Sequence, residues 1–140
     1  MSAFDEKRVI TYGAFDQFDA GHVALLRRLA SMGDKLIIGL STDEYCAETG
    51  TPIQVPFEAR RDMLEACRYV DRVIPEHDAH QKRTDIVNYN VALFAMDERW
   101  AGIFDELSDL TQVLYIPRES TLEPRLKPQD SRQEHYVKSA

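Results

Sequence analysis

Cysteine is scarce in this chain: 140 residues include two, Cys46 and Cys67. They form no CxxC motif and no cluster with histidine, so we expect two reduced thiols rather than a disulfide framework. No apolar run approaches the roughly 20 residues needed to cross a bilayer. The first residues, MSAFDEKR, lack the apolar core of a secretory signal. These absences predict a cytoplasmic protein with no membrane partner.

Positive charge is also in short supply. Lysine and arginine number 17 against 24 aspartates and glutamates, and the formal net charge is −7. A general nucleic-acid surface is normally basic, so we expect no nucleic-acid partner. A small phosphate site is still compatible with this charge, because a few local donors and a helix N-terminus can bind phosphate inside an acidic protein.

What the chain does contain is an ordinary globular mixture, 44% hydrophobic and 29% charged. Its length predicts one domain with a single core, over residues 1–118. From Pro117 onward the sequence turns polar and has few large apolar side chains. Residues 119–140 are therefore expected to form a C-terminal arm that is irregular or partly disordered.

Short apolar runs alternate with helical patterns along the domain. The runs predict strands at Val9–Tyr12, Leu36–Leu40, Arg72–Ile74, Val91–Met96 and Gln112–Ile116. Helices are expected at Ala20–Met32, Phe57–Arg68, Ala79–Asn88 and about Trp100–Ser108. This alternation predicts an α/β fold: a doubly wound, Rossmann-like, five-stranded parallel sheet in three α/β/α layers. Ligands of such sheets bind at the carboxyl ends of the strands.

The segment Val9–Leu29, VITYGAFDQFDAGHVALLRRL, is the most informative part of the chain. A strand, a turn containing Gly13 and a helix N-terminus form a place where backbone N–H groups can surround an anion. His22, in the first turn of that helix, adds a donor or proton carrier. Asp19 has three interpretations: an N-cap of the helix, a ligand for a metal or an altered substrate, or a tolerated change.

The same segment resembles the first motif of the cytidylyltransferase-like nucleotidyltransferases, which carry an H-x-G-H signature there. The likeness is greatest to the bacterial glycerol-3-phosphate cytidylyltransferases. It continues through GDKLIIGLSTDEY, FEARRDMLEACRYVDRVIPE, a loop with Trp100 and VLYIPR, and covers about Val9 to Arg118. The resemblance implies a homodimer that uses CTP, a small phosphorylated alcohol and Mg²⁺, although no protein ligand for the metal is identified.

The resemblance also implies roles for individual residues. His22 matches the second signature histidine and Arg118 opens the last motif, so both are expected to be catalytic. The nucleotide and its phosphates are expected to contact Tyr12, Gly13, Ala14, Phe15, Asp19, Gly21, Arg60, Trp100, Ser120 and Thr121. Asp16 is expected to be a turn residue that holds the loop.

Several positions depart from the family pattern. Asp19 replaces the first histidine, Ala14 replaces a threonine, and residues 46–55 contain no lysine. Residues 96–99 lack the glycine and the pair of aspartates usual before Trp100, and RESTLE replaces the R-T-x-G-I-S-T-T motif. The resemblance implies transfer of CMP from CTP to an acceptor such as glycerol 3-phosphate, with release of pyrophosphate. The alternatives are a catalytically impaired nucleotide-binding or regulatory homologue, or a transferase for a differently charged substrate.

Overall fold

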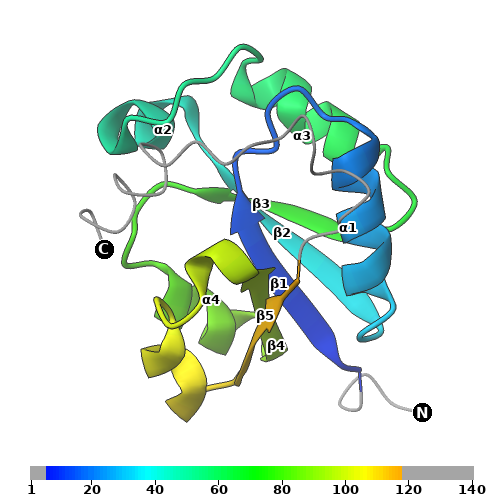
Figure 1. Ribbon diagram of the computed structural model, residues 1–140, viewed down its shortest axis with the longest axis vertical. Helices are drawn as coiled ribbons and strands as arrows, with labels where there is room; N and C mark the ends of the chain where they lie inside the picture. Colours follow the sequence, from blue (N-terminus) through cyan, green and yellow to red (C-terminus); the bar gives the residue numbers. More distant parts are fainter. Residues whose placement is uncertain (1–5, 118–140) are drawn as a thin grey trace.

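A twisted parallel sheet runs through the centre of the computed structural model, which describes residues 6–117 (Figure 1). Its strands are β1 (Arg8–Gly13), β2 (Lys35–Ser41), β3 (Arg72–Glu76), β4 (Val91–Asp97) and β5 (Gln112–Ile116). Every neighbouring pair is parallel, in the order β3-β2-β1-β4-β5. The predicted fold class and all five predicted strands are confirmed.

The strand order reverses at the centre of the sheet. From β1 the chain steps outward to β2 and β3, then returns to the other side of β1 to form β4 and β5. Connections leaving β1 and β4 therefore diverge at their carboxyl ends, which is the place where open α/β sheets form a ligand crevice. The turn after β1 belongs to the segment Val9–Leu29 that the sequence analysis singled out.

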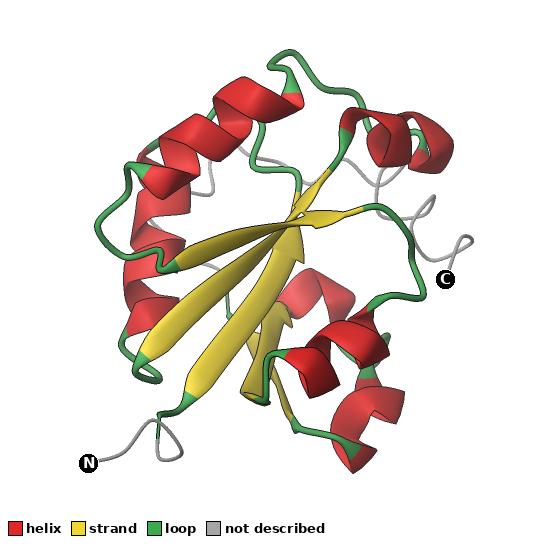
Figure 2. Cartoon of the chain, turned by 180° about the vertical axis from the view of Figure 1, so that it is seen from behind, coloured by secondary structure: helices red, strands yellow, loops and turns green. Residues whose placement is uncertain are grey.

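The helices are α1 (Ala20–Ala30), α2 (Asp43–Thr49), α3 (Phe57–Glu65) and α4 (Lys82–Asn88), with 3₁₀ helices η2 (Glu98–Trp100) and η3 (Asp105–Asp109). Helices lie on both sides of the sheet (Figure 2). Leu26 and Leu29 of α1 and Leu64 of α3 pack in the core on one face. Ile86 of α4 and Leu107 of η3 pack in a second core on the other face.

Side chains of β1 point alternately to the two faces of the sheet and so contribute to both cores. Val9 belongs to the α1 side, and Ile10 and Tyr12 belong to the α4 side, as the period of two in a strand requires. Tyr12 pairs in register with Gly39 of β2. A Cβ at Gly39 would lie 2.3 Å from the Tyr12 ring, so only glycine lets this ring lie across the neighbouring strand.

The helices differ from the prediction in two places. The sequence analysis did not predict α2, a seven-residue helix with Thr42 as N-cap and Gly50 in the left-handed conformation as C-cap. A continuous helix over Trp100–Ser108 was expected, but the chain forms the separate turns η2 and η3. Gly102 lies between them at φ 86°, a backbone conformation that ends a right-handed helix.

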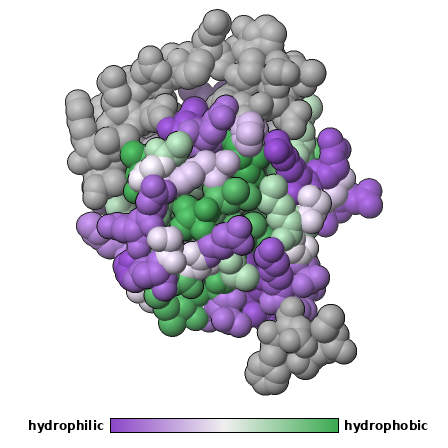
Figure 3. Space-filling view, turned by 60° about the horizontal axis from the view of Figure 1, so that its bottom comes forward, coloured by the Kyte–Doolittle hydropathy of each residue, from purple (hydrophilic) through white to green (hydrophobic). Residues whose placement is uncertain are grey.

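The described surface is mixed in character. Figure 3 views the molecule from the side at the bottom of Figure 1 and shows hydrophobic surface bordered by hydrophilic side chains. Large exposed apolar side chains in the described part are Met63, Val87 and Leu110. Over residues 6–117 no helix has the length and apolar character of a membrane span. Cys46 and Cys67 are both free thiols, as expected.

Candidate active site

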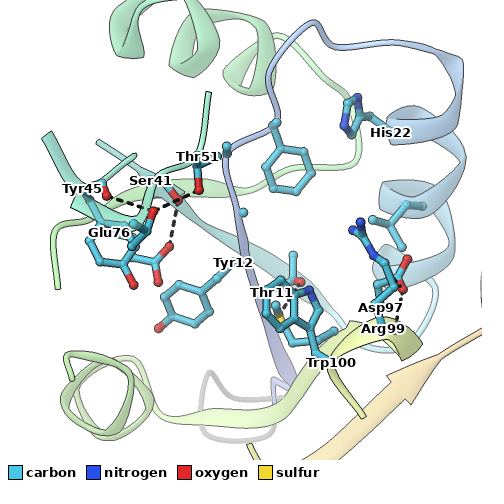
Figure 4. A pocket seen from close by; sticks show the side chains of 16 residues that line it. Thr11, Tyr12, His22, Ser41, Tyr45, Thr51, Glu76, Asp97, Arg99 and Trp100 are labelled. Carbon is cyan, nitrogen blue, oxygen red and sulfur yellow. Dashed lines mark hydrogen bonds and ion pairs between the residues drawn. The ribbon is translucent and has the colours of Figure 1, made fainter. Parts of the chain in front are cut away.

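A pocket opens at the carboxyl ends of β1 to β4, next to the reversal in strand order (Figure 4). The lining comes from the ends of these four strands and from the segments that follow β1, β2 and β4. Its residues are Thr11, Tyr12, Gly13, Ala14, Phe15, His22, Leu25, Ser41, Tyr45, Thr49, Thr51, Glu76, Met96, Asp97, Arg99 and Trp100. The expected position of a ligand site, at the carboxyl edge of the sheet, therefore holds a real cavity.

The turn after β1 forms one wall of this pocket in a strained conformation. Phe15 has φ 49° and Gln17 has φ 51°, values that bulky side chains seldom adopt. Asp16 holds the turn from outside, because its carboxylate accepts hydrogen bonds from the backbone N–H groups of Gln54 and Val55 at 2.9 Å. The expected role of Asp16 as a turn residue is confirmed.

Arg60 ties the same wall to the rest of the fold. Its side chain is 0% exposed, and Nη1 donates to the backbone carbonyls of Ala14 at 2.9 Å and Ser41 at 2.8 Å. Nε donates to Val55 O at 2.8 Å, and Nη2 pairs with Asp43 at 2.7 Å. The phosphate role predicted for Arg60 does not fit this placement, because its donors are directed at four protein acceptors.

Helix α1 brings His22 to the pocket and Asp19 to the helix start. Asp19 Oδ1 accepts from the backbone N–H of His22 at 3.1 Å, and His22 Nδ1 accepts from the backbone N–H of Asp19 at 3.2 Å. The two residues form a reciprocal capping box. Of the interpretations of Asp19, the N-cap is the one confirmed, and its carboxylate is not part of the described lining.

Two aromatic rings hold the His22 imidazole. The Phe18 ring stacks on it with centroids 5.5 Å apart and planes 7° apart, and the Phe15 ring tilts against it at 5.5 Å. Aromatic contacts of this kind restrict rotation of the histidine side chain. The strained turn after β1 and the capping box of α1 therefore both contact the His22 imidazole.

The opposite wall comes from the end of β4 and from η2. Asp97 is the N-cap of η2, accepting from the backbone N–H of Arg99 at 2.8 Å, and its carboxylate oxygen lies 3.4 Å from Arg99 Nε. Arg99 is the only permanently positive side chain among the described residues that line the pocket. Trp100 also lines it and packs against Phe104, with ring centroids 6.2 Å apart.

The third side of the pocket is polar and rests on a buried ion pair. Glu76 accepts from Ser41 Oγ at 3.0 Å and from Lys82 Nζ at 2.7 Å. The Lys82 ammonium also lies 4.8 Å from the centroid of the Tyr12 ring. Tyr12 in turn donates its hydroxyl hydrogen to Asp85 at 2.8 Å. This network fixes the carboxylate and the Tyr12 ring at the base of the cavity.

Comparison with known proteins decides the family. A model of the cytidylyltransferase-like family matches residues 10–133. The chain belongs to this family. Glycerol-3-phosphate cytidylyltransferase of Bacillus subtilis (strain 168) is 44% identical over 112 residues, 80% of this chain and 87% of the relative. The protein of that name from Staphylococcus aureus (strain NCTC 8325 / PS 47) is 46% identical, with 80% and 85% covered.

A solved structure shares the fold. The lipopolysaccharide core biosynthesis protein from Thermoplasma volcanium GSS1 superposes with a TM-score of 0.70 over 81% of this chain and 98% of that chain. At 20% identity this likeness supports the α/β fold and no more.

Within this family member, the predicted site residues divide into three groups. The pocket brings together Tyr12, Gly13, Ala14, Phe15, His22 and Trp100. Of the predicted residues that the structure describes, Asp19, Gly21 and Arg60 are not part of the lining. Arg118, Ser120 and Thr121 lie outside the described residues, and their expected roles stay predictions.

Several lining residues were not predicted. They are Thr11, Leu25, Ser41, Tyr45, Thr49, Thr51, Glu76, Met96, Asp97 and Arg99. Their common signal is position, since Ser41, Glu76 and Asp97 each end a strand. Polar residues at the carboxyl ends of parallel strands gather at one edge, and this rule would have found those three.

Proposed function

We propose that this protein is an enzyme that transfers a cytidylyl group from CTP to glycerol 3-phosphate. A phosphate oxygen of the acceptor attacks the α-phosphorus, the bond to the bridging oxygen of the β-phosphate breaks, and pyrophosphate leaves. The observation that carries the proposal is identity of 44% and 46%, over 80% of this chain, to two proteins named glycerol-3-phosphate cytidylyltransferase. The pocket described above supplies a place for the reaction.

The chemistry asks little of the protein beyond positioning and charge stabilisation. Figure 4 shows His22 and Arg99 on one side of the pocket, here called the nitrogen side, and Ser41, Thr51 and Glu76 on the other, the hydroxyl side. We assign the phosphates of CTP to the nitrogen side, because imidazole and guanidinium groups donate to phosphate oxygens. The hydroxyl side then suits the alcohol groups of a polyol.

Arg99 has a specific place in this proposal. Residues 46–55 contain no lysine, although the family tends to hold phosphates with lysines there. Arg99 brings a permanent positive charge to the pocket from a different loop, and Asp97 orients its guanidinium through a contact of 3.4 Å. We propose that Arg99 offsets part of the charge that the missing lysines would have supplied.

Mg²⁺ also belongs to the proposal. Over residues 6–117 no group of three or more His, Cys, Asp or Glu side chains is arranged to hold a metal ion. Glu76 and Asp97 line the pocket but already accept hydrogen bonds from protein donors. Such a donor set fits an ion carried mainly by substrate phosphates, as Mg²⁺ often is. When bound, Mg²⁺ would neutralise charge on the triphosphate.

The test is pyrophosphate release from CTP with Mg²⁺ and a panel of phosphorylated polyols that includes glycerol 3-phosphate. His22→Ala should lower kcat by about 100-fold or more, the loss seen when one donor to a transition-state oxyanion is removed. His80→Ala, in an exposed loop outside the pocket, is the matched control and should leave kcat unchanged. Arg99→Gln should raise the KM for CTP about tenfold through loss of one charged contact.

Each other result points elsewhere. Binding of CTP without turnover would favour the nucleotide-binding homologue that has lost catalysis. Turnover with a different acceptor would assign a different substrate class. A failure to bind any nucleotide would overturn the proposal. A homodimer, implied by the resemblance, and a cytoplasmic location, predicted from the composition, complete it. Light scattering during size-exclusion chromatography and fractionation of host cells test these two parts.

A further inference from the structure

We infer that Tyr115 is a positioning residue, which holds the Trp100 wall of the pocket by fastening the turn between η2 and η3 to the sheet. The inference rests on the proposed function, because CTP is the ligand whose binding this wall would affect. It is carried by the contacts of one phenol hydroxyl on β5, a strand that contributes no residue to the described lining of the pocket.

The Tyr115 hydroxyl bonds to the turn in two places. The backbone N–H of Phe104 donates to Tyr115 Oη at 2.9 Å, and Oη donates its hydrogen to Asp105 Oδ1 at 2.9 Å. The direction of both bonds is fixed, because an amide N–H only donates and an ionised carboxylate only accepts. Burial raises the pKa of the Tyr115 hydroxyl above its ordinary value, so the phenol keeps its donated proton at neutral pH.

Tyr115 is a firm point of attachment because its backbone belongs to the sheet. It pairs in register with Met96 of β4, which lines the pocket one residue before Asp97. Its ring is partly buried against the second core, as are Trp100 and Ile103. The sheet therefore fixes where the hydroxyl lies, and the hydroxyl fixes the turn.

The turn needs such an attachment. It bends at Gly102, which has φ 86°, and a Cβ there would meet no heavy atom of the described chain within 4 Å apart from its chain neighbours. Phe104 is the N-cap of η3, so its N–H lies outside the hydrogen bonds of that helix. Because Phe104 is 6% exposed, loss of the Tyr115 acceptor would leave a buried N–H without a partner, which is costly.

Two contacts connect this fastened segment to Trp100. The backbone N–H of Ile103 donates to Trp100 O at 2.9 Å, and the rings of Phe104 and Trp100 pack with centroids 6.2 Å apart. Figure 4 shows Trp100 among the side chains of the pocket. An indole ring suits the planar base of a nucleotide. Tyr115 thus supports a surface for the CTP base from outside the lining.

Fluorescence tests the inference without any turnover. Trp100 is the single tryptophan of the chain, so its emission reports on this wall. In full-length protein, Tyr115→Phe should lower the fluorescence anisotropy of Trp100 and raise its quenching by acrylamide, because the turn gains freedom. Tyr69→Phe removes the same hydroxyl from a tyrosine that packs against the other core, and it should change neither quantity.

Kinetics separates positioning from stability. Tyr115→Phe should raise the KM for CTP about fivefold, the equivalent of one hydrogen bond, and leave kcat near the wild-type value. A purely structural role would lower the urea midpoint without dividing KM from kcat in the folded protein. Asp105→Ala keeps the bond from Phe104 to Tyr115, so it should give smaller changes in KM and in Trp100 fluorescence.

A double variant tests whether Tyr115 acts through Trp100. Trp100→Ala combined with Tyr115→Phe should have the same KM for CTP as Trp100→Ala alone, because the hydroxyl then has no indole ring left to position. A further rise in KM in the double variant would mean that Tyr115 acts by another route, and it would overturn the inference.

Other results would overturn it as well. Trp100 fluorescence that stays unchanged in folded Tyr115→Phe protein would do so, and so would equal effects of Tyr115→Phe and Tyr69→Phe. An effect of Asp105→Ala as large as that of Tyr115→Phe would assign the role to the carboxylate instead of the hydroxyl. If the protein bound no CTP, the proposed function would fail, while the fluorescence would still decide whether Tyr115 positions Trp100.

Discussion

Two buried cations stand near the carboxyl edge of the sheet, Arg60 and Lys82, and they do different work. Arg60 donates to three backbone carbonyls and one carboxylate that come from three separate stretches of chain. Lys82 has its ion pair with Glu76 and lies over the rings of Tyr12 and Phe104. One cation holds loops in place, and the other sets the charge at the base of the pocket.

The difference shows which kinds of contact a guanidinium group and an ammonium group each make in a protein interior. The planar fork of Arg60 reaches several acceptors in fixed directions, so it can fasten the strained turn after β1 to the end of β2 and the loop before α3. The Lys82 ammonium is a point charge, matched here by one carboxylate. We therefore expect loss of Arg60 to damage the walls of the site, and loss of the Lys82 pair to damage mainly its base.

The largest expected effect is that of Arg60→Ala. This change removes the guanidinium donor from three carbonyls and from the Asp43 carboxylate and opens a cavity, so it should lower the free energy of unfolding by about 3–5 kcal/mol. Urea unfolding followed by circular dichroism measures it. Arg61→Ala, on the same helix but partly exposed, is the control and should cost far less. Equal losses in the two variants would contradict this account.

A smaller effect is expected for Glu76→Gln. The Lys82 ammonium loses the carboxylate that lies 2.7 Å from its Nζ, while the amide oxygen of the new glutamine can still accept a hydrogen bond, so the free energy of unfolding should fall by about 2–3 kcal/mol. Replacing both partners, Glu76→Leu with Lys82→Met, should restore most of the loss, because apolar side chains of similar volume need no partner. If the double variant were as unstable as Glu76→Gln, the packing of the site and not its charge would be the cause.

The smallest effect is expected at an exposed pair, Arg83 and Asp109, whose charged atoms lie 2.6 Å apart. The hydrogen bond from Arg83 lowers the pKa of Asp109, so any stability it contributes is present above the unfolded pKa of about 3.9 and is lost as pH falls through the folded pKa. Asp109→Asn should leave the urea midpoint at pH 7 unchanged in physiological salt, because solvent screens the pair. A clear shift that persists in high salt would contradict this expectation.

The framework could be predicted from sequence because its signals are local and repeated. Runs such as Leu36–Leu40 are apolar throughout, as strands covered on both faces must be. The errors fell on short elements. The helix α2 has seven residues and depends on Thr42 and Gly50 at its ends, and the backbone at Gly102 divided an expected helix into two turns. In such elements single caps and single dihedral angles decide the outcome.

The candidate site was less predictable because motif position does not say where a side chain points. Arg60 lies where family members carry a basic residue, yet the fold turns its guanidinium inward. Arg99 departs from the family pattern, yet the end of β4 brings it to the pocket. The cap was one of three interpretations of Asp19, and its second contact, through the backbone to His22 Nδ1, depends on the side-chain conformation of His22.

The sequence by itself determined the family, the order of the strands along the chain and the segment that carries His22, because motifs and periodicity are written in neighbouring residues. The tertiary structure alone decided which charged side chains are paired with buried protein groups and which line the pocket. That distinction depends on acceptors brought together from distant segments, such as Ala14, Ser41 and Val55 around Arg60. A buried donor must find acceptors wherever the fold places them, and no local pattern records that choice.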